Sequence, residues 1–442
     1  MRTTIFVAAV LALFCGSARA QTGGVTAAAK PPVAKSLQPP AKAASTPELR
    51  SAAELALSSD PVFDDGTYLR IKEALLSYSD IQVRGGWPAL PADAKLLVPG
   101  SSGPAVALLR QHLVISDDMS EAKWAGDAYD NDLVEAVKRF QLRHGLDATG
   151  SVGAQTLKAL NVPIGDRIKQ LEASLERLQG MDFTFAERYV VVNIPAAFVE
   201  AVANGKVERR YRVIVGAIDK PSPTLSVYIT AIDLNPTWTV PLSITKNEII
   251  NRMRKDPNYL SRMHMRVLGA HDEDIDPASI DWSSDRSPNF TVRQDAGAWN
   301  ALGYLKIDMP NPYSVYMHDT DTRNLFAADY RFDSHGCTRV DNVRDLAAWI
   351  LQDGPPGWDR AAIDAGITSG VSKVINLPRK IPVAWVYLTG WVTSDGTVEF
   401  RDDVYKHDEA LDRAGLNDAV RAGGFVAPLS QAVTQASNLD SR

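Results

Sequence analysis

The residue types best suited to chemistry lie in one short segment of the 442-residue chain, residues 334–340 (Ser-His-Gly-Cys-Thr-Arg-Val). Cys337 follows His335 by two positions, and a second histidine, His318, lies 19 positions upstream of the cysteine. A cysteine nucleophile needs a thiolate, a nearby base or cation, and hydrogen-bond donors for the oxyanion that develops on the substrate. The two histidines are the candidate bases, and the N–H groups of Gly336 and Cys337 are the candidate oxyanion donors. A helix that we expect to begin near Asp341 would bring its positive end close to the thiol and lower the thiol pKa.

The chain has only two cysteines, Cys15 and Cys337. Cys15 lies in a segment with the features of an export signal: a positive charge at Arg2, a mostly apolar stretch over 3–14, and a small-x-small cleavage site that ends at Ala20. We expect residues 1–20 to be a signal peptide that removes Cys15; the alternative is a short N-terminal anchor. Cys337 then has no intramolecular disulfide partner in an exported protein, so it is a candidate reactive thiol; the alternative is a buried, inert cysteine.

Composition and charge exclude several classes of protein. Hydrophobic residues make up 45% and charged residues 23% of the chain, which excludes a largely disordered chain and a fibre. The formal net charge of −6 argues against a nucleic-acid-binding protein, because such proteins carry a basic surface. No apolar run of about 18–20 residues follows the N-terminal segment, so we expect no membrane span in the mature chain.

The first part of the chain is expected to be linker and helix. Residues 21–47 are rich in Ala, Pro and Lys, which predicts a flexible tether. Residues 48–97 place Leu69, Leu75 and Leu76 at helical spacing, which predicts a helical scaffold. Residues 98–162 predict a compact three-helix unit with a turn at 147–150 (Asp-Ala-Thr-Gly), and residues 163–182 predict one more scaffold helix.

From residue 188 the hydrophobic period changes from that of helices to that of strands. Runs rich in β-branched and aromatic residues predict strands at 189–194, 211–215, 227–234, 315–318 and 383–388. Helices are expected near 244–255 and over 341–351. The whole pattern predicts a multidomain α+β chain, with a mostly β domain over 183–408 and a weakly patterned tail over 409–442.

A zinc site is the main alternative interpretation of the same reactive residues. Cys337, His318 and His335 could supply three ligands, the number typical of catalytic zinc sites. His335 and Cys337 lie only two positions apart in a glycine-containing turn, however, and the chain has no His-Glu-x-x-His motif. His264 and His271 are expected on the surface of a polar segment. We therefore expect no metal and no cofactor.

Two parts of the chain resemble known families. The opening of the 98–162 unit, with the pattern Gly-x-x-Gly-x-x-Val-x-x-Leu-Arg, its segment 136–141 and its turn 147–150 resemble the three-helix peptidoglycan-binding module. The alternative for this unit is a helical spacer without a ligand. The pattern His-x(~15)-Ser-His-Gly-Cys-x-Arg resembles the signature of the L,D-transpeptidases, the YkuD-type enzymes that cross-link peptidoglycan. Further blocks similar to the large periplasmic branch of that family occur at 191–195, 222–224, 232–241, 293–303 and 400–405.

The resemblance implies a catalytic role for each matching residue. Cys337 would be the nucleophile and His318 the proton acceptor and donor, oriented by the backbone carbonyl of Asp319. His335 would line the site and help to polarise it, beside the oxyanion donor at Gly336. The implied catalytic fold is a mostly β, mixed-sheet sandwich that follows a helical scaffold and the peptidoglycan-binding module.

The resemblance also implies the substrate-binding residues. Arg339 stands where many relatives have Asn, and its guanidinium fork would suit a substrate carboxylate. The alternative for Arg339 is a local salt bridge to Asp341 or Asp345. The residues implied to bind substrate are Arg339, Ser334, Asp319, Trp238 and Asn300. Residues 242–292 are implied to form a lid over the cleft, the alternative being a structural insert with no gating role.

The implied activity is that of an exported, periplasmic, wall-associated L,D-transpeptidase. Cys337 would attack the carbonyl of diaminopimelate, the third residue of a donor tetrapeptide stem, and release D-alanine. The side-chain amine of a second stem would then take the acyl group. Water as acceptor would give an L,D-carboxypeptidase, and a lipoprotein lysine would give an anchoring enzyme. The expected partners are stem peptides and the sacculus, and carbapenems are the expected inhibitors. An exported zinc peptidase or amidase and a non-catalytic wall-binding protein remain as alternatives.

Overall fold

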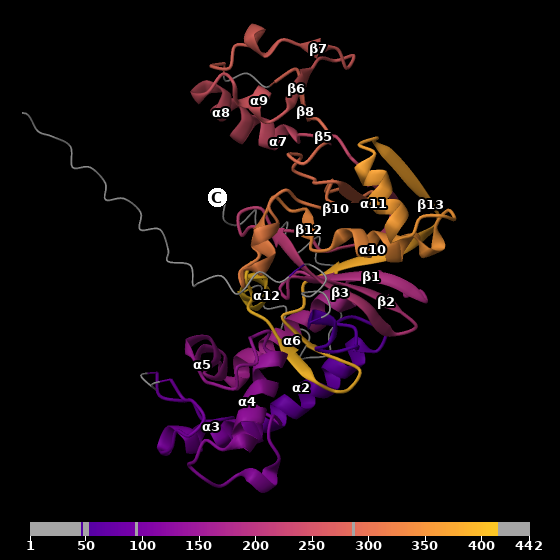
Figure 1. Cartoon of the computed structure of the whole chain (residues 1–442). Coiled ribbons are helices and arrows are strands. Elements are labelled where there is room, and N and C mark those ends of the chain that lie inside the picture. The colour runs from indigo at the N-terminus through magenta and orange to yellow at the C-terminus, as the bar shows by residue number, and fades with distance from the viewer. Residues whose placement is uncertain (1–45, 47–52, 93–95, 285–287, 414–442) are drawn as a thin grey trace, which may run out of the picture. The chain divides into compact units, whose positions relative to one another are not determined.

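The computed structural model describes residues 46, 53–92, 96–284 and 288–413. The expected signal peptide (1–20), the expected linker apart from Thr46, and residues 414–442 of the expected tail lie outside the described residues. In the described part of the chain, no helix combines the length and the apolar character needed to cross a membrane. The architecture there is multidomain α+β, with helices first and a mostly β domain after them (Figure 1).

The 98–162 unit, here called the module, folds as three helices around its own apolar core. Its elements are α3 (Pro104–Ile115), the 3₁₀ turn η1 (Glu121–Lys123), α4 (Asn131–Arg143) and α5 (Ala154–Leu160). Asp130 caps α4 by accepting a hydrogen bond from the N–H of Leu133 at 2.9 Å. Gln141 of α4 ties down the predicted turn, because its side-chain oxygen accepts from the N–H of Gly150 at 2.9 Å. The predicted three-helix unit is confirmed.

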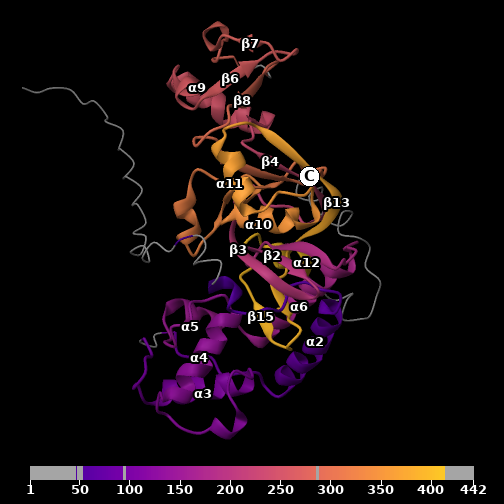
Figure 2. The same cartoon turned by 45° about the vertical axis from the view of Figure 1, so that its right-hand side comes forward.

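Two scaffold helices, α2 (Thr67–Val83) and α6 (Ile164–Gln179), lie against each other and against the hairpin of β14 (Gly390–Val392) and β15 (Val398–Phe400) (Figure 2). The helix over α2 was predicted, but of the three leucines that indicated it only Leu75 packs against the core. Leu69 and Leu76 are 62% and 74% exposed, whereas Ile71 and Tyr78 are buried. Tyr78 packs its ring 5.7 Å from that of Phe400. A partner distant in sequence therefore decides which face of α2 is buried.

The C-terminal tail was predicted to begin at residue 409, but the helix there continues to Arg413. Helix α12 (His407–Arg413) contacts α6, and Leu411 is buried. The carboxylate of Asp408 accepts hydrogen bonds from Arg177 at 2.5 Å and from Thr389 at 2.6 Å. Residues 409–413 are thus part of the fold rather than of a tail.

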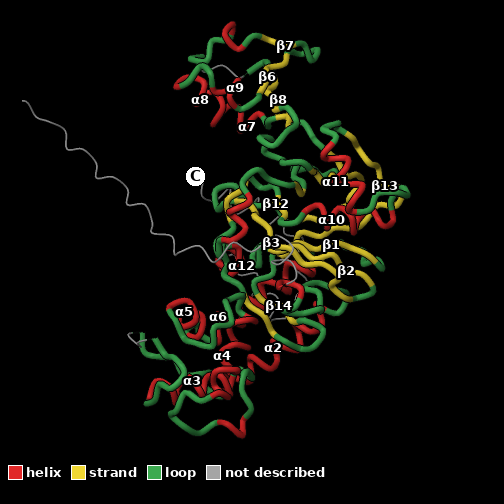
Figure 3. Tube along the Cα trace, in the orientation of Figure 1, coloured by secondary structure: helices red, strands yellow, loops and turns green. Residues whose placement is uncertain are grey.

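The β domain is built on one mixed sheet of nine strands, in the order β11-β3-β12-β10-β9-β4-β13-β1-β2 (Figure 3). β2 also pairs with β3, so the sheet closes on itself where a sandwich would have two separate sheets. Closure is achieved because β3 is long: its first part pairs with β2 and its later part with β12. The strands are β1 (Arg188–Asn193), β2 (Phe198–Ala203), β3 (Lys206–Gly216), β4 (Leu225–Leu234), β9 (Leu305–Asp308), β10 (Met317–His318), β11 (Phe332–Ser334), β12 (Thr338–Val340) and β13 (Lys373–Val386).

Both faces of this sheet are covered, which explains the unbroken apolar run of β1. Val190 and Val192 belong to a core that includes residues of α10 (Val343–Ile350) and α11 (Arg360–Thr368). Tyr189 and Val191 belong to a second core, which they share with the scaffold helices and the β14–β15 hairpin. Two 3₁₀ turns complete the domain, η4 (Arg323–Ala327) and η5 (Leu351–Asp353).

Residues 238–294 form a body with its own sheet and core, here called the insert subdomain (Figure 1). Its sheet has the order β5-β8-β6-β7. It is wider than the predicted 242–292 because Trp238 and Gln294 pair at its base. Its elements are β5 (Trp238–Thr239), α7 (Leu242–Ile244), the π-helical turn η2 (Thr245–Ile249), α8 (Ile250–Lys255), α9 (Tyr259–Arg262), β6 (Met265–Leu268), β7 (Asp274–Ile275), the 3₁₀ turn η3 (Pro277–Ser279) and β8 (Thr291–Gln294).

Candidate active site

Two neighbouring parallel strands bring the predicted reactive residues together. His318 ends β10 and Cys337 directly precedes β12, with His318 paired opposite Arg339. A hydrogen bond also joins the two strands, because the N–H of Thr338 donates to the carbonyl of Tyr316 at 3.0 Å. Because side chains alternate between the faces of a strand, this register places Tyr316, His318, Cys337 and Arg339 on one face.

The Cys337 side chain is half-buried, and this changes the chemistry of its thiol. Desolvation raises the pKa of the thiol to about 11; hydrogen bonds with Tyr316 and the charges of Lys306 and Arg339 act in the opposite direction without offsetting it. The sequence predicted a lowered pKa from the start of the following helix, and that prediction is wrong for this structure. β12 separates Cys337 from α10, which begins at Val343, and the influence of a helix dipole falls off within its first turn. The thiol is therefore protonated at neutral pH and needs a base.

His318 has the properties of that base. The residue is 5% exposed, and desolvation, together with the charge of Arg339, lowers the pKa of the imidazole to about 3. The backbone of Asp319 acts in the opposite direction on this pKa. The orienting role that the resemblance gives to the Asp319 carbonyl stays a prediction. Among the described residues, Nδ1 of His318 has no hydrogen-bond partner. A neutral imidazole with a free ring nitrogen is equipped to accept a proton.

A network of short hydrogen bonds holds the turn that carries Cys337. Gly336 has a φ of +104°, a backbone conformation that favours glycine. The hydroxyl of Ser334 donates to the carbonyl of Cys337 at 2.5 Å and accepts from the N–H of Gly336 at 3.2 Å. The hydroxyl of Ser222 donates to the carbonyl of Gly336 at 2.8 Å and accepts from the N–H of Gly216 at 2.9 Å. The loop after β3 is therefore fastened to the turn.

Three residues implied to bind substrate have their polar groups occupied by the fold. Asn300 is completely buried, and its amide donates to backbone carbonyls. Ser334 is buried, and its hydroxyl serves the turn. Asp319 is buried, and its carboxylate is held by Arg323 and a backbone N–H. The polar atoms of these side chains are therefore already bonded within the fold, and binding of substrate by them stays a prediction.

Trp238 and Arg339 keep their predicted places at the site. Trp238 hydrogen-bonds with the hydroxyl of Tyr316, which in turn contacts the Cys337 thiol. Arg339 is half-buried and makes no ion pair with any described residue; Asp345 pairs instead with Arg209. Binding of substrate by either residue stays a prediction.

The predicted oxyanion donors differ from each other. The N–H of Gly336 is bonded to Ser334, whereas the N–H of Cys337 has no partner among the described residues. The oxyanion role therefore stays a prediction, and it rests mainly on Cys337. In the residues that the structure describes, no group of three or more His, Cys, Asp and Glu side chains is placed to hold a metal ion.

Three polar residues around this turn were missed by sequence reasoning. Tyr316 precedes His318 by two positions, and the period of a strand could have revealed it. Glu248 of the insert subdomain lies 2.5 Å from Nε2 of His335, and its carboxylate accepts from Nζ of Lys220 at 3.0 Å. Lys220 and Glu248 carry no local signal, because they lie 115 and 87 positions from His335.

Comparisons with known proteins agree with this arrangement. Residues 187–374 match the family model described as "YkuD: L,D-transpeptidase catalytic domain", and residues 102–160 match the one described as "Putative peptidoglycan binding domain". A curated protein of Haemophilus influenzae named "Putative L,D-transpeptidase" is 31% identical over 229 residues. The match covers 52% of this chain and 46% of that protein, so the chain spans less than half of its relative's length.

Solved structures add only weak matches. An L,D-transpeptidase from Mycobacterium smegmatis is 17% identical, over 46% of this chain and 59% of its own, with a TM-score of 0.22. One from Stackebrandtia nassauensis is 13% identical, over 60% of this chain and 92% of its own, with a TM-score of 0.25. The similarity of this chain to L,D-transpeptidases therefore rests on the two family models. Residues 187–374, which hold Cys337 and His318, are thus similar to the L,D-transpeptidase catalytic domain, and residues 102–160 of the module are similar to the peptidoglycan-binding domain.

Proposed function

We propose that this chain is an exported, periplasmic peptidoglycan L,D-transpeptidase that joins two diaminopimelate residues through a thioester on Cys337. The observation that carries the proposal is the placement of Cys337 beside a buried, neutral His318 whose Nδ1 has no partner in the part of the chain that the structure describes. The module would hold the enzyme on the sacculus, which raises the effective concentration of stem peptides at the site.

Acylation begins with transfer of the thiol proton to His318 as sulfur attacks the carbonyl of diaminopimelate in the donor stem. The new S–C bond gives a tetrahedral oxyanion, and the N–H of Cys337 is the nearest free donor for it. The C–N bond to D-alanine then breaks, and His318 returns its proton to the leaving amine. A thiol pKa of about 11 and an imidazole pKa of about 3 both disfavour a separated thiolate–imidazolium pair. The proton therefore moves as the S–C bond forms, and the imidazolium stays beside the developing oxyanion.

The thioester is resolved by the side-chain amine of a second stem. The amine attacks the acyl carbon, His318 accepts the amine proton, and the proton passes to the departing sulfur. A peptide bond between two diaminopimelate residues results, and Cys337 is again a thiol. Water as the attacking group would instead release a tripeptide stem, which is the carboxypeptidase alternative on the same residues; a lipoprotein lysine would give an anchored product.

Mass spectrometry of purified tetrapeptide muropeptides after incubation with the mature protein tests the proposal. We expect a cross-linked dimer that has lost one D-alanine, with no product from Cys337→Ala, because alanine cannot form the thioester. Tripeptide monomers alone would assign the carboxypeptidase activity. Turnover by Cys337→Ala, or turnover abolished by EDTA and restored by zinc, would contradict the cysteine mechanism.

A further inference from the structure

A cluster of three charged or titratable side chains joins the insert subdomain to the turn that carries Cys337. Nζ of Lys220 lies 3.0 Å from the Glu248 carboxylate and 2.6 Å from Nε2 of His335. The same Glu248 oxygen lies 2.5 Å from Nε2 of His335. Nε2 can accept from Lys220 or donate to Glu248, but a single ring nitrogen cannot do both at once. The cluster is therefore built around one carboxylate that an ammonium and an imidazole share.

The cation of the cluster is fixed to the β domain. Lys220 lies in the loop that folds back after β3, and a side chain at Gly216 would put its Cβ 2.3 Å from the carbonyl oxygen of Lys220. The hydroxyl of Ser222 bonds this loop to Gly336, directly before Cys337. Glycine at 216 thus permits a tight loop that holds the ammonium group beside the turn of Cys337.

The carboxylate of the cluster comes from a different body. Glu248 lies in η2, the π-helical turn of the insert subdomain, and π-helical turns occur frequently at functional sites. The neighbouring Ile249 packs into the insert's own apolar core. Lys220, Glu248 and His335 keep 40%, 31% and 38% of their side chains exposed. Ion pairs so open to water contribute little net stability, so a competing carboxylate can displace Glu248.

We propose that Lys220 determines donor specificity by binding a carboxylate of the stem peptide, and that Glu248 occupies this position until the donor arrives. The inference rests on the proposed function for the identity of the donor. The ammonium of Lys220 contacts His335, which precedes the nucleophile by two positions. This arrangement suits a substrate carboxylate that lies near the scissile carbonyl. The donor stem has two such groups, the side-chain carboxylate of diaminopimelate and the terminal carboxylate of D-alanine. Engagement of either one releases the contact between the insert subdomain and the β domain.

Donors amidated at one carboxylate or the other test the proposal. With wild-type protein, we expect amidation of the recognised carboxylate to lower kcat/KM by about 10- to 100-fold, while the other amide has little effect. Lys220→Met should lower kcat/KM for the unmodified donor by a similar factor, mainly through KM, and should erase the preference over the amide. Glu248→Gln should lower KM and keep the preference.

Lys246→Gln is the matched control, because Lys246 is exposed on the same π-helical turn. This variant should behave as wild type in every assay. A Lys220→Met protein that still prefers the free carboxylate, or a wild-type protein indifferent to both amides, would overturn the inference. Wild-type protein that turns over no donor would instead overturn the proposed function.

Alkylation of Cys337 tests the cluster without any peptide substrate. The ratio of labelling rates with anionic iodoacetate and neutral iodoacetamide reports the charge that an incoming group meets. We expect this ratio to rise several-fold in Glu248→Gln, because Lys220 is freed, and to fall in Lys220→Met. In the double variant the rise should disappear. A rise of the same size in the double variant would show that Glu248 acts only as a repelling charge, and would overturn the role of Lys220.

Discussion

Buried histidines occur in two regions of this molecule, and they differ in one respect. His318 lies in the candidate active site, whereas His112 and His144 lie where the module meets the scaffold. Desolvation lowers the pKa of His112 and of His318 to about 3 and holds that of His144 well below its ordinary value. Nδ1 of His112 lies 3.3 Å from the carbonyl of Pro88, and Nδ1 of His144 lies 2.7 Å from that of Phe140. Of these three histidines, only His318 has an Nδ1 without a hydrogen-bond partner among the described residues.

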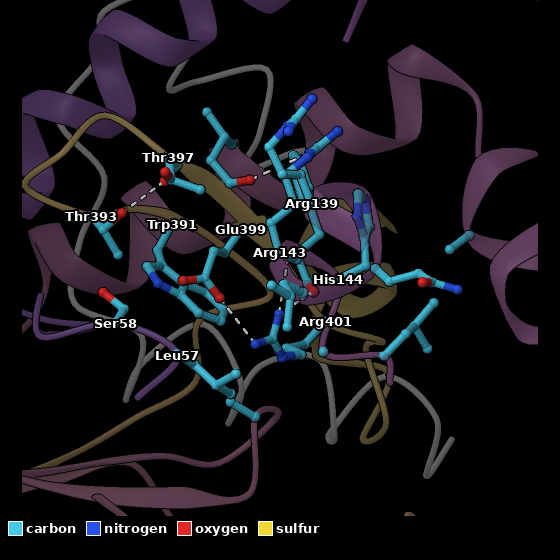
Figure 4. Close-up of a pocket in the computed structure, with 18 of the residues that line it drawn as sticks. Leu57, Ser58, Arg139, Arg143, His144, Trp391, Thr393, Thr397, Glu399 and Arg401 are labelled. Atoms are coloured by element: carbon cyan, nitrogen blue, oxygen red, sulfur yellow. Dashed lines mark hydrogen bonds and ion pairs between the residues drawn. The ribbon is translucent and has the colours of Figure 1, made fainter. Parts of the chain in front are cut away.

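The surroundings of His144 show what a satisfied polar interior looks like. His144 lines a cavity of about 1860 Å³ beside Arg143 and Arg401, and neither Cys337 nor His318 reaches it (Figure 4). Arg143 is buried but fully engaged, with its guanidinium bonded to Asp118 at 2.5 and 2.7 Å. Burial and a shifted pKa are therefore common to both regions, and the unpartnered nitrogen separates a candidate base from structural histidines.

The largest expected effect comes from replacing each kind of histidine by glutamine, because one substitution should affect kcat and the other the free energy of unfolding. We expect His318→Gln to lower kcat by about 10²- to 10⁴-fold with little change in the free energy of unfolding, because its free nitrogen serves proton transfer. His144→Gln should leave kcat on a soluble stem peptide within about two-fold and should destabilise the fold by roughly 1–3 kcal/mol. Release of D-alanine and urea unfolding measure the two quantities. Equal kinetic losses in the two variants would remove the distinction.

The next largest effect should come from the buried ion pair of the module. Arg143 and Asp118 keep only 9% and 3% of their side chains exposed. Replacement of Arg143 by Met leaves the Asp118 carboxylate buried and uncompensated, so we expect a loss of about 3–5 kcal/mol in the free energy of unfolding. The double variant Arg143→Met/Asp118→Asn should recover much of this loss. No recovery would show that packing of the arginine stem, rather than charge, is responsible.

These two regions also show what sequence alone could predict. The Cys337 and His318 pair was predictable, because the chemistry of each residue type is local and the strand pattern around 315–318 is clear. The buried face of α2 was not, because Phe400 supplies its partner from the other end of the chain. The raised thiol pKa was also not predictable, since desolvation depends on the whole enclosure. Lys220 meets His335 only through folding of the β domain, and Glu248 meets it only through folding of the insert subdomain.

A smaller effect is expected from the protonation of His112, which should make the free energy of unfolding depend on pH. The folded-state pKa of His112 is about 3 and its unfolded value is about 6.5, so the unfolded chain binds more protons between these values. The stability that neutral His112 contributes is fully present above about pH 6.5 and is lost as pH falls toward 3. The loss should approach about 1.4 kcal/mol per pH unit for one histidine.

The difference in the free energy of unfolding between wild type and His112→Gln isolates this contribution. Buried carboxyl groups such as Glu200 and Asp408 have raised pKa values and act with the opposite sign, so the total profile is a mixture. The difference in unfolding free energy between the two proteins should shrink as pH is lowered from 7 to 5, because only wild type carries the penalty. A pH-independent difference would mean that the pKa of His112 is the same in the folded and the unfolded chain.

The smallest effect should come from an exposed ion pair between α5 and the segment after β15, which both line the cavity beside His144. Nζ of Lys158 lies 2.7 Å from the Asp402 carboxylate, but 65% and 74% of these side chains are exposed. Water and salt screen such a pair, and ordering two mobile side chains offsets most of the attraction. A double-mutant cycle with Lys158→Ala and Asp402→Ala should therefore give a coupling free energy below about 0.5 kcal/mol, vanishing near 1 M salt. A coupling above about 1.5 kcal/mol that survives high salt would show that water is excluded from this boundary. The distinction between the module's buried, paired charges and its solvent-exposed rim would then have to be withdrawn.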